Sequence, residues 1–89
     1  MTKNNMEDGI SKNFINNLYS IASFTGYGIT NLERSAGVGS GYCSMCKLRN
    51  SSPTLRVVEM FSKSTGYKVE DLVRDPEEFR KKVLNLCQL

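Results

Sequence analysis

Two cysteines three residues apart, Cys43 and Cys46, are the side chains of this sequence whose types and spacing could do chemistry. A Cys-x-x-Cys pair is typical of thiol–disulfide redox sites and can supply half of a zinc site. A redox pair needs a thiolate at the start of a helix that follows a strand, and no strand pattern precedes Cys43. A zinc site needs four ligands as a rule, but the chain has no histidine and only one other cysteine, Cys87. We therefore interpret Cys43 and Cys46 as small apolar side chains in a helix interface, and we expect no metal and no cofactor.

Other combinations that could support catalysis are weak. Without histidine the usual general base near neutral pH is missing. The acidic pairs Glu70-Asp71 and Glu77-Glu78 lie where helix starts or solvated faces would place them. The glycines of the stretch 37–41 lack the lysine and following hydroxyl of a phosphate-binding loop. The sequence therefore predicts no catalytic residue, no small-molecule substrate and no enzyme activity.

Two short helices must position the cysteines. The first starts after Thr30, a predicted N-cap, and ends at Gly37, where a left-handed residue is favoured. The second starts after Ser40, another predicted N-cap, and carries both cysteines on its inner face. Two short helices joined by a tight glycine turn are the pattern of a helix-turn-helix, here with inward apolar residues at Leu32, Ala36, Val38, Cys43 and Cys46.

The flanking segments complete an all-helical pattern. Ser11 is a predicted N-cap for a first helix with one apolar stripe, made of Phe14, Ile15, Leu18, Ile21 and Ala22. Thr54 is predicted to cap a further helix that Gly66 closes, with Leu55, Val57, Val58 and Phe61 inward. A short helix over 68–74 and a last helix from Pro76 to about Cys87, capped by Asp75, follow. We predict an all-α, compact five- to six-helix fold. It consists of a mobile arm over 1–9, a helix-turn-helix domain over 10–74, and a C-terminal helix over 75–89 that packs on the core or forms a dimer seam.

Composition and charge restrict the class of protein and its location in the cell. The chain has 89 residues, 39% hydrophobic and 24% charged, which suits one globular domain. No apolar run is long enough for a membrane span, and the N-terminus lacks a secretory signal, so we expect a cytoplasmic protein. The net charge is +3, and the excess of basic residues lies in the stretch 12–56. This stretch has one acidic residue, Glu33, and five basic residues, Lys12, Arg34, Lys47, Arg49 and Arg56. Residues 57–89 hold six basic and six acidic residues, which balance. A phosphate-binding surface would require such a bias.

The ordered set Leu32-x4-Gly37-Val38, Cys43-x2-Cys46, Pro53-Thr54-Leu55 and Thr65-Gly66-Tyr67 resembles the Cro/cI (Xre-type) repressor family. The likeness covers roughly 14–73. It implies a lambda-repressor-like helix-turn-helix domain, and a bacterial or phage transcriptional regulator that binds an operator in double-stranded DNA, commonly as a homodimer. Four positions depart from the family pattern: Glu33 replaces an alanine, Ile29 a glutamine, Lys47 an acid and Arg49 a glycine.

The resemblance implies which side chains face DNA. The helix around Ser40–Leu48 would enter the major groove, where serines hydrogen-bond base edges and methionine meets a thymine methyl. The predicted DNA-binding residues are Thr30, Ser40, Gly41, Tyr42, Ser44, Met45, Arg49 and Asn50. No arginine, lysine, asparagine or glutamine occupies a base-reading position, which favours shape readout over direct readout. The same uncharged surface also suits a second hypothesis, a helix-turn-helix fold used as a protein-interaction module without DNA binding.

Overall fold

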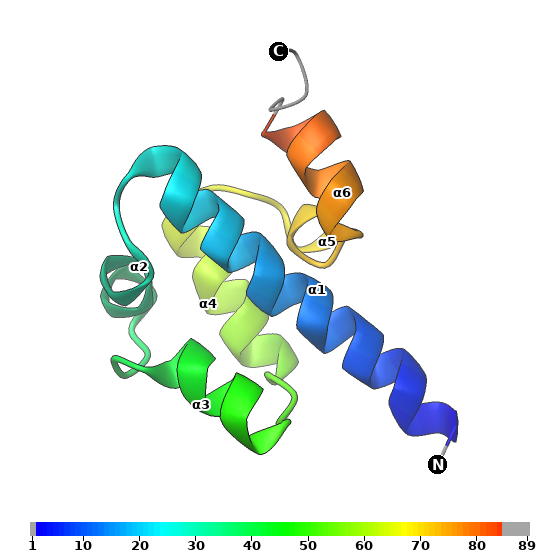
Figure 1. Ribbon diagram of the computed structural model, residues 1–89. Helices are drawn as coiled ribbons and strands as arrows, with labels where there is room; N and C mark the ends of the chain where they lie inside the picture. Colours follow the sequence, from blue (N-terminus) through cyan, green and yellow to red (C-terminus); the bar gives the residue numbers. More distant parts are fainter. Residues whose placement is uncertain (1, 85–89) are drawn as a thin grey trace.

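The computed structural model describes the backbone of residues 2–84 and the side chains of residues 9–84. Every regular element in this range is helical, which confirms the all-α class (Figure 1). The elements are α1 (Thr2–Thr25), α2 (Ile29–Ala36), α3 (Tyr42–Arg49), α4 (Leu55–Thr65), α5 (Val69–Leu72) and α6 (Pro76–Glu78), which continues into a π-helical turn, η1 (Phe79–Val83).

The long helix α1 is the element on which the others pack. It contacts α2, α3, α5, α6 and η1, and α2 packs in turn on α4. Figure 1 shows α1 crossing in front of α4, with α2 and α3 on one side and α5 and α6 on the other. The predicted apolar stripe of α1 is buried, as are Val58 and Phe61 of α4. The prediction that Leu55 faces inward is wrong, because Leu55, in the first turn of α4, is 67% exposed. The rings of Phe14 and Phe61 pack edge to face, with their centroids 5.7 Å apart, so α1 and α4 form the centre of the core.

Several predicted helix ends are confirmed by their geometry. The Thr54 hydroxyl accepts a hydrogen bond from the Val57 N–H at 3.3 Å. The Asp75 carboxylate accepts from the N–H groups of Glu77 and Glu78 at 3.2 and 3.4 Å. Gly37 ends α2 at φ 90°, where a side chain would be strained. These helix ends could be predicted from the sequence because helix capping depends on residues that are neighbours in the chain.

Three predicted helix starts are wrong. The first helix begins at Thr2 rather than after Ser11, so residues 2–9, which we predicted as an arm, continue α1. Extending an existing helix costs little, and it does not require an apolar stripe. α2 begins at Ile29, because the Leu32 N–H already bonds the Gly28 carbonyl at 3.2 Å, so Thr30 is not its cap. α3 begins at Tyr42 with Gly41 at the cap position, so Ser40 is not a cap.

The C-terminal segment contributes to the core. Phe79 is fully buried and Leu84 nearly so, and the Phe79 ring contacts Tyr67 edge to face at 5.8 Å. Packing on the core is one of the two roles we predicted for this segment, and a dimer seam stays a prediction. The expected end of the last helix, at Cys87, lies outside the described residues.

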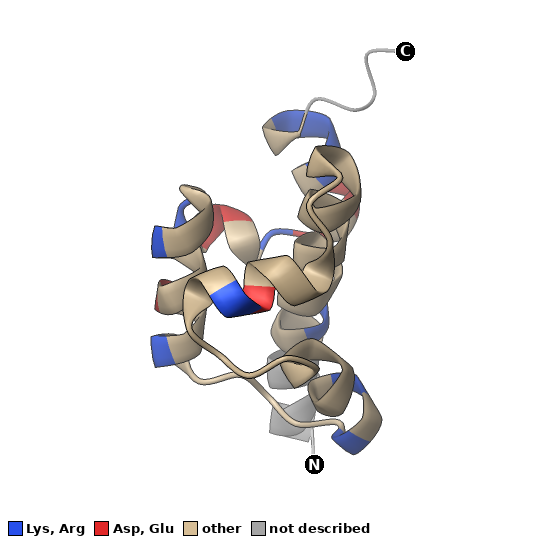
Figure 2. Cartoon of the chain, turned by 90° about the vertical axis from the view of Figure 1, so that its left-hand side faces the viewer, with Lys and Arg blue, Asp and Glu red and all other residues tan. Residues whose placement is uncertain are grey.

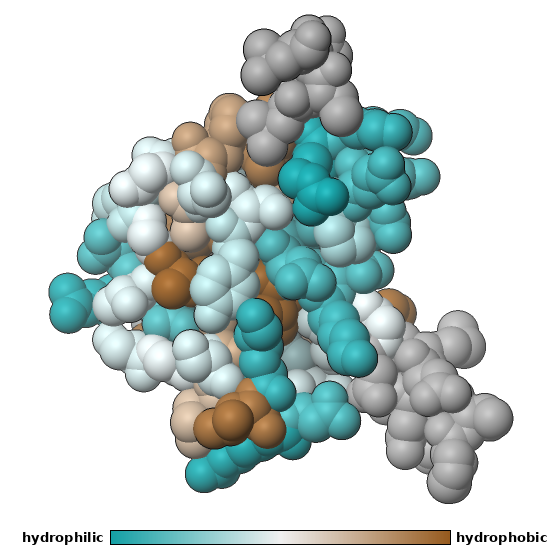
Figure 3. Space-filling view, viewed as in Figure 1, coloured by the Kyte–Doolittle hydropathy of each residue, from teal (hydrophilic) through white to brown (hydrophobic). Residues whose placement is uncertain are grey.

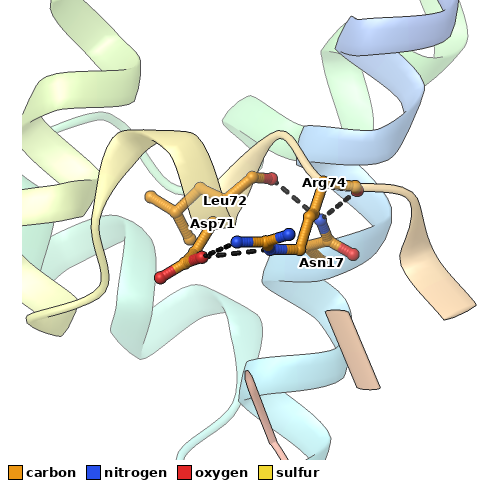
Figure 4. Close-up of polar contacts among 4 residues, drawn as sticks. All are labelled: Asn17, Asp71, Leu72 and Arg74. Atoms are coloured by element: carbon orange, nitrogen blue, oxygen red, sulfur yellow. Dashed lines mark hydrogen bonds and ion pairs between the residues drawn. The ribbon is translucent and has the colours of Figure 1, made fainter. Parts of the chain in front are cut away.

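A buried asparagine fastens the C-terminal part to α1. Asn17 is completely buried, and its amide nitrogen donates to the carbonyl oxygens of Leu72 at 2.9 Å and Arg74 at 2.8 Å (Figure 4). The Arg74 guanidinium forms an ion pair with Asp71 at 2.9 Å. The turn after α5 is therefore held from both sides. None of the helices in the described range has the length and apolarity needed to cross a membrane.

Candidate functional site

The centre of the site is the unit formed by α2, the turn over 37–41 and α3. Cys43 and Cys46 of α3 are 0% and 7% exposed, so both point into the core as predicted. Both are free thiols. Their burial fixes the rotation of α3 about its own axis, because two inward residues three positions apart leave the opposite side of the helix to solvent.

Glu33 connects α2 to α3. It is 1% exposed, and its two carboxylate oxygens accept hydrogen bonds from the N–H groups of Gly41 at 2.8 Å and Cys43 at 2.9 Å. These N–H groups belong to the free amino-terminal end of α3, where a negative charge is favoured. Glu33 therefore caps α3 from the preceding helix, which is why a glycine suffices at the cap position and Ser40 is not needed there.

Sequence reasoning missed this role for Glu33. In the sequence, Glu33 stands out only as a large acidic residue at a position where the Cro/cI family has alanine. The available signal was the combination of an acid on the inner side of α2 with a following helix whose cap position is glycine. An inward carboxylate needs donors, and the free N–H groups of the next helix are the nearest source.

The thiol of Cys43 is poorly suited to redox chemistry. Burial, and then the charge and hydrogen bonding of Glu33, raise the pKa of Cys43 far above its ordinary value. Burial and a hydrogen bond with Cys46 likewise raise the pKa of the Tyr42 phenol. Because the thiolate is the nucleophile and the metal ligand, a thiol held protonated is unreactive. Within residues 9–84, no three side chains of His, Cys, Asp or Glu are grouped as metal ligands.

One exposed side of α3 is uncharged and largely apolar. Ser44 is exposed, Met45 is 42% exposed and Leu48 is 81% exposed, and the three lie on one side of the helix. We call Ser44, Met45 and Leu48 the α3 face. Figure 3 shows hydrophobic surface over α3 with hydrophilic atoms beside it. Leu48 was missed as a site residue, although it follows Met45 by one helical turn and the sequence offered that signal.

The other predicted site residues lie at the two ends of α3, except Thr30, which lies on α2. Gly41 and Tyr42 are half-buried at the start of α3, and Tyr42 packs against the core. Thr30 is exposed but belongs to the first turn of α2. Asn50 is exposed at the C-cap of α3, where it adopts a left-handed backbone with φ 56°. Ser40 precedes the cap position of α3 and Arg49 is the last residue of α3, and both are exposed. Apart from Thr30, the predicted set therefore follows α3 and its two ends rather than forming a closed site.

Exposed charge over 12–56 has a single sign. The basic residues of this stretch, Lys12, Arg34, Lys47, Arg49 and Arg56, are all exposed. Its one acid, Glu33, is buried and bonded to backbone N–H groups. The ion pairs found among residues 9–84 involve Asp71 with Arg74 and Glu77 with Lys81, outside this stretch. Figure 2 shows lysine and arginine in blue on α2, α3 and α4. The exposed charged side chains of this stretch are therefore all basic.

Comparison of the chain with protein families, with curated proteins and with solved structures gives no match.

Proposed function

We propose that this protein binds double-stranded DNA through α3 and acts as a helix-turn-helix transcriptional regulator of the Cro/cI type. The observation that carries the proposal is the combination of an exposed, uncharged α3 face with exposed charged side chains over 12–56 that are all basic. Phosphates attract the basic side chains, and the uncharged α3 face can contact the edges of the bases.

The dimensions and chemistry of α3 suit the major groove. Its 8 residues span about 12 Å, close to the groove's width of about 12 Å. The Ser44 hydroxyl is suited to a hydrogen bond with a base edge, and Met45 and Leu48 are suited to thymine methyl groups. None of these three makes a bidentate contact, so sequence preference would come from methyl contacts and from DNA shape.

The exposed basic residues of 12–56 give an expected salt dependence. If each of the five exposed cations of 12–56 neutralises one phosphate, the slope of log affinity against log salt is about −4.5 per protein molecule. Binding should therefore be moderate and strongly weakened by salt. An operator of two half-sites bound by two copies would compensate for the weak readout of a single α3 face.

The test is a fluorescence-anisotropy titration of the full chain against a pool of random duplexes at two salt concentrations. We expect binding that weakens as salt rises, followed by recovery of a preferred sequence when a randomised pool is subjected to selection. A palindromic preferred sequence would indicate a dimer. Failure to bind any duplex at the lower salt concentration would refute the proposal.

A second function is favoured by one specific observation, the high exposure of Leu48 and Met45. Apolar side chains at the centre of a surface with a charged rim are also typical of protein–protein interfaces. On this hypothesis the α2–α3 unit is a protein-interaction module. Copurification of a stoichiometric partner together with failure to bind DNA would favour it over the first proposal.

A further inference from the structure

A groove lies between α1 and the end of α3, beside the α3 face. Its volume is about 240 Å³, and its polar lining comes from Ser11, Lys12, Asn16, Lys47, Asn50 and Ser51. Ile15 contributes an apolar floor. The polar groups are two ammonium groups, two amides and two hydroxyls, and no acid among residues 9–84 lines the groove. This set of donors suits an anion with several oxygens.

The size of the groove restricts the ligand. Sites for drug-sized molecules usually measure about 300–1,000 Å³, and this groove is smaller. It can hold a single tetrahedral oxyanion with accompanying water, but it cannot enclose a whole nucleotide. A phosphoryl group is the common biological anion of this size and oxygen count, and it matches the two lysines in charge.

Part of the lining is fixed in position before any ligand arrives. The Lys47 ammonium lies 4.8 Å from the centroid of the Tyr19 ring, a cation–π arrangement that restrains an otherwise flexible side chain. Asn50 is held in its left-handed conformation at the C-cap of α3. The Ser51 N–H bonds the Cys46 carbonyl at 3.0 Å, which anchors the same turn to α3. Restrained donors lose less entropy on binding.

We propose that the groove between α1 and α3 binds a phosphoryl group, with Lys12 and Lys47 as its charged partners. Lys47 also lines a shallow hollow together with Ser44 and Leu48 of the α3 face. A phosphate adjoining a helix that lies in the major groove would therefore meet Lys47 first. The phosphoryl group has two sources, a DNA phosphodiester or a free phosphate; the first rests on the proposed function and the second does not.

The first experiment uses inorganic phosphate with the full chain. Backbone amide shifts are followed by NMR as phosphate replaces chloride at constant ionic strength, for the unaltered protein, Lys12→Gln and Lys63→Gln. Lys63 is a matched control, because it is exposed in the last turn of α4, the end away from α3 (Figure 1). We expect saturable shifts at residues 11–16 and 47–51 that Lys12→Gln weakens severalfold and Lys63→Gln leaves unchanged. Shifts that do not saturate, or that Lys12→Gln leaves unchanged, would overturn a site for free phosphate.

The second experiment measures duplex affinity against salt for the same three proteins. If a phosphodiester occupies the groove, Lys12→Gln reduces the steepness of the log–log slope by about 0.9, and Lys63→Gln does not. Saturable phosphate binding without any duplex binding would support the groove and refute the proposed function. Duplex binding with equal slopes for the two variants and no saturable phosphate binding would overturn the groove and leave the proposed function standing.

Discussion

The carboxylate of Glu33 in α2 accepts a hydrogen bond of 2.9 Å from the backbone N–H of Cys43 in α3. A second bond, from the Gly41 N–H at 2.8 Å, occupies the other carboxylate oxygen. Both bonds cross the turn between the two helices, so one side chain sets the position of α3 relative to α2. The orientation of the α3 face therefore depends on a residue that does not belong to it.

Replacing Glu33 with alanine should be strongly destabilising. The Glu33→Ala variant leaves two N–H groups of α3 without their acceptor and removes a buried side chain. A lost bond to a charged group costs about 1.5–3 kcal/mol, so we expect the free energy of unfolding to fall by about 3 kcal/mol. Urea denaturation followed by circular dichroism measures this change.

The control for Glu33 is Glu59→Ala, which removes an exposed carboxylate from α4. Its free energy of unfolding should stay within about 0.5 kcal/mol of the unaltered protein. If Glu33→Ala were as mild as Glu59→Ala, the carboxylate would not be holding α3, and the account of the turn would be wrong.

Local rules made most of the fold predictable. The apolar stripe of α1 follows from helical periodicity, and Asp75-Pro76 follows from capping chemistry. Helix starts were predicted less well, because Ser11, Thr30 and Ser40 each match a cap pattern that competing backbone geometry overrides. Ser40 is not the cap of α3 because the Glu33 carboxylate accepts the hydrogen bonds at the start of that helix. The hydrogen bond from the Gly41 N–H to Glu33 joins residues eight positions apart, which is too far for a local capping pattern to reveal.

The candidate site divides in the same way. The inward rotation of Cys43 and Cys46 follows from their spacing, so the outward side of α3 was predictable. The groove was not, because it depends on how α1 and α3 are brought together in three dimensions. Lys12 and Lys47 are 35 positions apart in the sequence, and no periodicity connects residues on two separate helices.

Stability should decrease in alkaline solution. The pKa of Cys43 is raised by burial and by Glu33, so the folded protein keeps a proton that the unfolded chain releases above about pH 9. Because the unfolded state then binds fewer protons, the free energy of unfolding falls by about 1.4 kcal/mol per pH unit for this group. Below the thiol's ordinary range the effect is absent. Urea denaturation between pH 8 and pH 10.5 measures the slope.

The control for this pH dependence is Cys43→Ala, which removes the titrating thiol. We expect a shallower decrease in stability between pH 9 and pH 10 than in the unaltered protein. Tyr42, whose pKa is also raised by burial, adds a further decrease above pH 10 in both proteins. Identical slopes for the two proteins below pH 10 would contradict the assignment to Cys43.

Asn17→Ala tests the connection between α1 and the segment after α5. The variant removes the donor to the carbonyl oxygens of Leu72 and Arg74, and the first of these bonds is buried. We expect the free energy of unfolding to fall by about 2 kcal/mol in urea denaturation. Its neighbour Asn16 is exposed, so Asn16→Ala should change stability by less than about 0.5 kcal/mol. Equal effects of the two variants would mean that the bonds of Asn17 contribute nothing measurable.

Ser44→Glu tests the α3 face directly. Ser44 is exposed, so the variant should fold normally, but it places a negative charge where the proposal places the edges of base pairs and the nearby phosphates. We expect duplex affinity in the anisotropy assay to fall at least tenfold, about 1.4 kcal/mol, with unfolding in urea unchanged. Ser64→Glu makes the same change in net charge at an exposed position in the last turn of α4. A similar loss in both variants would show that net charge, rather than the α3 face, determines binding, because only Ser44 adjoins Met45 and Leu48.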